Sequence, residues 1–68
     1  MRQEILRALK AEAEGNIYKA KLNIEIYLKN PVGIGEHPDI MAAIESELSE
    51  ISKAHEHIEV INHYFLDR

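Results

Sequence analysis

Both prolines of the chain and two of its three glycines lie within one ten-residue stretch, Asn30 to Asp39, which divides the sequence into two long segments. Proline lacks the backbone donor that a helix interior needs, and it restricts the residue before it. On either side, apolar residues recur every three or four positions, the period of one face of a helix. The sequence therefore predicts one all-α domain over residues 1–68: an antiparallel helical hairpin with a helix at about 2–29, a loop at 30–37 and a helix at about 38–66.

The first segment contains two features that compete with a single helix. Between Leu22 and Leu28, apolar and polar residues alternate with the period of a strand. No partner strand is apparent elsewhere, so we expect a helix here too. Gly15 is costly in a helix interior, and the segment could end there. We expect a continuous helix in which Gly15 allows close packing. The expected apolar stripe consists of Leu6, Leu9, Ala13, Ile17, Ala20, Ile24 and Tyr27.

The second segment carries clear start signals. Pro38 suits a first helical position, Asp39 places negative charge at the positive end of the helix dipole, and His37 would lie near the N-cap. An unbroken stripe follows, while Glu47 and the other glutamates mark the expected solvated sides. That stripe consists of Ile40, Ile44, Leu48, Ile51, Ala54, Ile58, Ile61 and Phe65.

The size of the chain points to self-association. A chain of 68 residues without cysteine has a marginal core and no disulfide or zinc-thiolate site to reinforce it. Two helices would leave part of each stripe facing water, so we expect two hairpins to pair as a homodimeric four-helix bundle. The predicted oligomer core consists of Ile17, Ile24, Ile44, Leu48, Ile51, Ile58, Ile61 and Phe65.

Charge and hydropathy argue against several classes of protein. A formal net charge of −4 has the wrong sign for binding phosphate backbones, so we expect no nucleic-acid partner. No apolar run approaches the roughly 20 residues of a membrane span, and the first residues lack the apolar stretch of a signal peptide. We therefore expect a cytoplasmic protein without a membrane partner.

Glycines before a helix start can bind phosphate through their backbone amides. Here no strand precedes Gly33-Ile34-Gly35 and no Lys-Ser/Thr pair follows it, while Glu36 and Asp39 bring negative charge. We expect a structural loop without a bound cofactor. The loop residues expected to contact a partner are Pro31, Gly33, Gly35, Glu36, His37 and Pro38.

Three histidines lie close together in the second segment. On a helix, His55, Glu59 and His63 would fall four residues apart, and facing copies in a dimer could hold a metal with them. The set lacks the spacing of known zinc and di-iron motifs, so we expect solvated or helix-pairing side chains and no resident metal. His55 and Asn62 could instead set the pairing register. Ser52 is the one serine within helical reach of His55 or Glu56, and we expect no catalytic residue.

The stretch from Asn23 to Ile40, with its Asn30-Pro31-Val32-Gly33-Ile34-Gly35-Glu36-His37-Pro38-Asp39 loop, is followed by acidic helical repeats ending in Tyr64-Phe65. This combination resembles small uncharacterised proteins of T4-like marine phages, especially cyanophages. The resemblance covers about the last two thirds of the chain and implies no activity. It implies an origin in a phage, with the infected bacterial cytoplasm as the place of action.

These observations predict a non-enzymatic protein–protein interaction module that forms homodimers and binds a host or phage protein. Two alternatives remain open at this point. One is a metal-binding helical bundle that uses His55, Glu59 and His63, and the other is a minor structural component of the virion.

Overall fold

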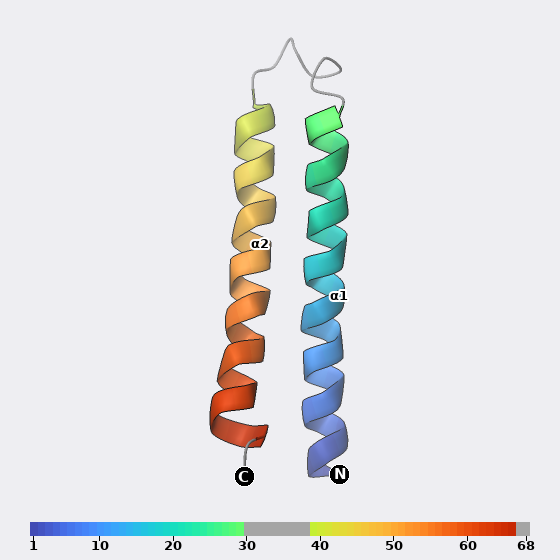
Figure 1. The fold of residues 1–68 in the computed structure, drawn as a ribbon, viewed down its shortest axis with the longest axis vertical. Coiled ribbons are helices and arrows are strands. Elements are labelled where there is room, and N and C mark those ends of the chain that lie inside the picture. The colour runs from blue at the N-terminus through green and yellow to red at the C-terminus, as the bar shows by residue number, and fades with distance from the viewer. Residues whose placement is uncertain (30–38, 67–68) are drawn as a thin grey trace.

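The computed structural model describes residues 1–29 and 39–66, which form two long helices lying side by side (Figure 1). Helix α1 spans Arg2–Lys29 and helix α2 spans Ile40–Ile61; α2 continues into η2, a π-helical turn over Asn62–Leu66. The helices run antiparallel, so that Met1 and η2 lie at one end of the hairpin, called here the terminal end. Lys29 and Ile40 mark the opposite end, called the loop end. The predicted all-α hairpin is confirmed.

Helix α1 is continuous through Gly15, and the alternating segment from Leu22 to Leu28 is helical throughout. Gly15 has no positive φ, and a Cβ added to it would meet no atom within 4 Å. The expectation that this glycine allows close packing is therefore wrong, because its side of α1 is open. A helix that packs along its whole length can tolerate the modest cost of one interior glycine.

Helix α2 begins two residues later than predicted. Asp39 occupies the N-cap position expected for His37, and its carbonyl accepts the first helical hydrogen bond from the Ala43 N–H at 2.9 Å. The Asp39 side chain makes no capping hydrogen bond, so its favourable contribution is its negative charge near the helix N-terminus. His37 and Pro38 lie outside the described residues.

The seam between the helices follows steps of three and four residues, but within α1 and α2 its register differs from the predicted one at two positions. Lys10 is half-buried in the seam where Leu9 was expected, although both residues are at helical spacing from Ala13. Glu47 is half-buried where Leu48 was expected, and it is not on a solvated side. Leu9 and Leu48 remain about half exposed, at 47% and 50%. The long stem of a lysine can pack in a seam while its charge stays in water.

Few side chains are covered by the hairpin itself. Among the described residues, those classed as buried are Ala13, Ala20, Ala54 and Ile61. Three of the four are alanines, whose small size lets helices approach closely. The molecule measures 51 × 15 × 13 Å, and its radius of gyration of 15.6 Å exceeds the roughly 11 Å of a compact domain of this length. The hairpin is a thin rod with very little core of its own.

The turn η2 changes the end of the α2 stripe. A π-helical turn contains one residue more than an α-helical turn, so it rotates the following side chains around the axis. Leu66 is half-buried, whereas Phe65, expected to continue the stripe, is 45% exposed. The Phe65 carbonyl accepts a hydrogen bond from Arg2 Nη2 at 2.9 Å, which ties η2 to the start of α1.

Candidate functional site

The hairpin has two long faces of different character, because the seam residues form two columns on each helix. On each helix, one of these columns contains isoleucines. The residues next to that column around the helix lie on one side of the hairpin. We call this side the isoleucine face and define it by Ile17, Ile24, Ile44, Ile51 and Ile58, with Leu28, Met41 and Leu48 along its border. The other column contains the buried alanines and faces the opposite side of the hairpin.

The isoleucine face is incompletely covered by the hairpin. Its five isoleucines are half-buried, since each packs against the opposite helix with part of its surface only. Leu28, Met41 and Leu48 are classed as exposed, and Met41 is the most exposed of the three at 72%. Contiguous apolar patches, as opposed to scattered single apolar residues, mark interaction surfaces in soluble proteins.

A groove runs along the opposite side, and we call it the alanine groove. Its main hollow has a volume of about 620 Å³ and includes Ala13 and Ala54, with Leu9, Val60 and Ile61 at its apolar end. A second hollow of about 360 Å³ continues it toward the loop end, because both include Asn16 and Glu50. Each hollow also has polar walls: Glu12, Lys53 and His57 line the main hollow, and Lys19, Asn23 and Glu47 line the second.

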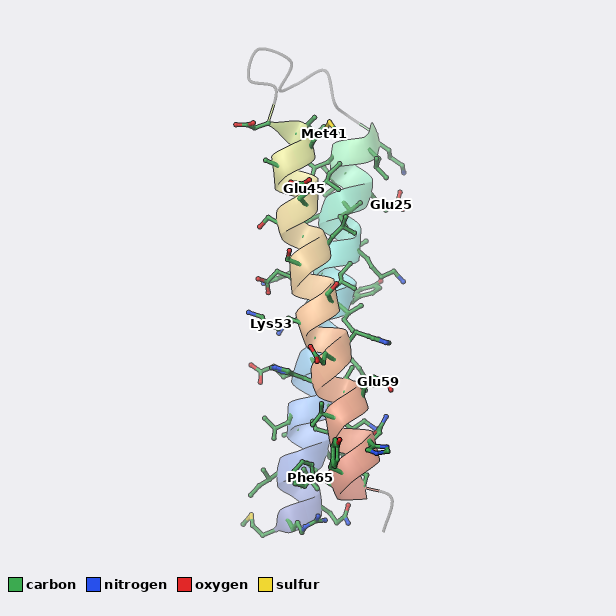
Figure 2. The ribbon with its side chains drawn as sticks, turned by 90° about the vertical axis from the view of Figure 1, so that its left-hand side faces the viewer. Glu25, Met41, Glu45, Lys53, Glu59 and Phe65 are labelled. Atoms are coloured by element: carbon green, nitrogen blue, oxygen red, sulfur yellow. The ribbon has the colours of Figure 1, made fainter. Side chains whose placement is uncertain are left out.

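The difference between the sides can be followed in Figure 2, where α2 lies in front. Lys53 and Glu59 project from opposite sides of α2: Lys53 from the groove side and Glu59 from the side of the isoleucine face. Lys53 pairs with Glu50 on its own helix, with Nζ and Oε2 separated by 3.9 Å. Both side chains are more than half exposed, so this pair contributes little to stability.

The candidate metal residues do not converge within one chain. His55 Nε2 lies 3.9 Å from Glu59 Oε2, while the His63 ring packs edge-on against Tyr64 with ring centroids 4.5 Å apart. Over residues 1–29 and 39–66, no group of three His, Asp or Glu side chains is placed to hold a metal ion. The hairpin thus offers an exposed His–Glu pair in place of a ligand set.

The predicted oligomer core falls into four groups in the hairpin. Ile17, Ile24, Ile44, Ile51 and Ile58 lie half-buried on the isoleucine face, and Ile61 is buried at the end of the groove. Leu48 borders the isoleucine face, and Phe65 is displaced by η2. The residues predicted to contact a partner, Pro31, Gly33, Gly35, Glu36, His37 and Pro38, lie outside the described residues.

Sequence reasoning did not find the alanine groove or the polar contact within the seam. Ala13 and Ala20 are seven residues apart, a spacing that places small residues on one helical column and could have indicated the groove. The half-buried hydrogen bond from Asn23 Nδ2 to Glu47 Oε2, at 3.3 Å, could not be anticipated because Glu47 was assigned to a solvated side.

Comparisons with protein families, with characterised proteins and with solved structures gave no match to this chain. Within the part of the chain that the structure describes, no helix is both long and apolar enough to cross a membrane. Any function proposed for this chain therefore rests on the two faces of the hairpin.

Proposed function

We propose that this chain is a non-enzymatic protein–protein interaction module that works as a homodimer, in which two hairpins pair as a four-helix bundle. The observation that carries the proposal is the incomplete burial of the isoleucine face. Five isoleucines of the two helices remain half-buried, and three further apolar residues beside them are exposed. Covering such a row with a second copy is the usual way for a short helical hairpin to complete a core.

The surface area of the chain supports this proposal. Its accessible surface is 5469 Å², whereas a compact monomer of 7.8 kDa has roughly 4,400 Å². The difference is of the order of the roughly 800 Å² that each partner buries in a standard interface. The hairpin has enough uncovered surface for one stable interface without any change in its fold.

Its cellular setting is proposed from the resemblance of residues 23–40 and the acidic repeats after them to small proteins of marine phages. We propose that the dimer acts in the bacterial cytoplasm during phage infection and binds a host or phage protein through the surface that dimerisation leaves free. That surface includes the alanine groove, whose polar walls and apolar end suit a mixed protein interface.

The dependence of thermal unfolding on chain concentration tests the dimer. Mass action favours a folded dimer as concentration rises, so its unfolding midpoint should rise over a hundredfold range of chain concentration. Circular dichroism reports the helix content at each concentration. A helical chain with the same midpoint throughout that range would contradict the proposal.

A further inference from the structure

We infer that the second copy packs on the isoleucine face in a parallel orientation, with the loop ends of the two hairpins together and α1 of each copy facing α2 of the other. This inference rests on the proposed homodimer. It adds which face pairs, how the copies are oriented and which surface remains free.

The choice of face follows from the residues that pairing on each face would bury. Pairing on the alanine groove would remove Glu12, Lys19, Lys53 and His57 from water. Charged groups are costly to bury unless each finds a partner. Pairing on the isoleucine face would bury the remaining surface of five isoleucines and Leu48, and it would also cover Glu14, Lys21 and His55, of which Glu14 and His55 can pair with each other across the interface. The apolar face is thus favoured, and the groove stays open.

The orientation follows from an uneven distribution of residues along the isoleucine face. The exposed apolar residues Leu28, Met41 and Leu48 lie in the half nearer the loop end. On the same side of α1, Arg7, Lys10 and Glu14 lie in the half nearer the terminal end, whereas one charged residue, Lys21, lies in the half nearer the loop end. A parallel pair places apolar half on apolar half. A fully overlapping antiparallel pair would place each apolar half on a charged half.

The level of each residue along the rod is fixed by two contacts between the helices. Asn23 hydrogen-bonds to Glu47, and Arg2 hydrogen-bonds to the Phe65 carbonyl. Residues of α1 and α2 whose numbers add up to about 67–70 therefore lie at the same level. In the parallel pair, α1 residues face α2 residues of the partner at that same level.

This register gives matching chemistry at both ends of the rod. Near the loop end, Leu28 faces Met41 of the second copy. Near the middle, Glu14 faces His55 of the second copy, whose imidazole can donate a hydrogen bond to a carboxylate. Toward the terminal end, Lys10 faces Glu59, and these side chains carry opposite charge. Lys21 faces Leu48 of the second copy, where the apolar stem of the lysine can pack on the leucine while its ammonium group stays in water.

An antiparallel pair could still match its apolar halves if the copies slid apart along the axis. Only about half of each rod would then overlap, because the apolar residues occupy one half. The isoleucines Ile51 and Ile58, nearer the terminal end, would lose much of their cover. Full overlap in the parallel orientation buries more apolar surface, and burial of apolar surface drives association.

Two matched leucines test the face. Leu48 borders the isoleucine face and Leu9 lines the alanine groove, and they are exposed to nearly the same extent, 50% and 47%. Glutamine has a helix propensity close to that of leucine, so Leu48→Gln and Leu9→Gln should perturb the helix equally little. We expect Leu48→Gln to raise the dimer dissociation constant at least about tenfold, since the change occurs in both copies. Leu9→Gln should change it less than about threefold.

Cross-linking tests the orientation, since the chain has no cysteine of its own. A chain carrying Leu28→Cys is mixed with one carrying Met41→Cys, and in a second sample with one carrying Arg7→Cys. A short bis-maleimide reagent is added, and mass spectrometry identifies the linked residue pair. Circular dichroism and light scattering confirm that each variant is helical and dimeric before reaction.

The parallel pair predicts efficient linkage of residue 28 to residue 41 of the other copy and little linkage of residue 28 to residue 7. Linkage of 28 to 7 in a dimer would overturn the orientation and leave the proposed homodimer intact. A dimer weakened by Leu9→Gln and unaffected by Leu48→Gln would overturn the choice of face. A chain that is monomeric at every concentration would overturn both this inference and the proposed function.

Discussion

The side-chain amide of Asn23 donates a hydrogen bond to the Glu47 carboxylate across the seam between α1 and α2, at 3.3 Å. Both residues are half-buried, and they occupy a level where the neighbouring seam residues are apolar. A single polar contact within an apolar seam costs some stability and fixes the register, because a shifted pairing leaves both groups without partners. In this hairpin the contact sets which α1 residue lies at the level of each α2 residue.

A double-mutant cycle on this pair should therefore show measurable coupling. We expect Asn23→Ala and Glu47→Ala to interact by about 0.5–1 kcal/mol, the range for a partly exposed hydrogen bond. The free energy of unfolding of the four chains, measured with urea at one fixed chain concentration, gives the coupling. Strictly additive effects would show that the contact is not maintained in solution.

Replacing Gly15 by alanine should stabilise the chain. Gly15 lies within α1 with no atom within 4 Å of an added Cβ, so the methyl group meets no obstacle and the unfolded chain loses conformational freedom. We expect a gain of about 0.5–1 kcal/mol in the free energy of unfolding. The reverse substitution at an exposed position of the same helix, Ala8→Gly, should lower the free energy of unfolding by a similar amount. A loss of stability in Gly15→Ala would indicate that this side of α1 is covered in the assembled protein.

The substitution Ala20→Leu, at a buried alanine, should disturb the packing between α1 and α2. Ala20 is 2% exposed, so a leucine there must either move α1 and α2 apart or turn into the hollow that Ala20 lines. Overpacking of this kind costs about 1–3 kcal/mol. Ala8→Leu, on the exposed side of the same helix, is the control and should change stability by less than about 0.5 kcal/mol. Urea unfolding gives the free energy of unfolding of both variants. Equal losses of stability in the two would contradict the close approach of the helices at Ala20.

Removal of metal ions should leave stability unchanged. His55 is placed beside Glu59, while His63 packs on Tyr64, so one chain presents no set of three ligands among its described residues. Thermal unfolding with and without a chelator, on protein purified without an affinity tag, provides the test. A lower midpoint in the presence of chelator would favour the metal-binding alternative, with ligands shared between copies.

The sequence was sufficient for the helices and the hairpin, since a three-and-four spacing bounded by prolines leaves few other folds. It was insufficient at Leu9 and Leu48, where an apolar residue stands next to the charged residue that occupies the seam. Both neighbours are at helical spacing from the stripe, so polarity decides the prediction in favour of the apolar residue, whereas the structure buries Lys10 and Glu47 more than Leu9 and Leu48. The error at Phe65 has another origin, because a π-helical turn has no signature in hydrophobic periodicity.

The candidate site, too, could be predicted only in part from the sequence. The isoleucines of the predicted oligomer core lie on one face because they share one helical column, which the sequence determines. The alanine groove depends on how closely two helices approach, and that distance follows from packing between distant parts of the chain. Its polar walls come from residues that, in the sequence, are indistinguishable from other solvated charges.

The solution mass of the wild-type chain, measured by light scattering over a range of micromolar concentrations, distinguishes a dimer from a single hairpin. We expect a helical species of twice the 7.8 kDa chain mass that dissociates only on dilution. A helical species that keeps the mass of one chain at every concentration would contradict the proposed homodimer.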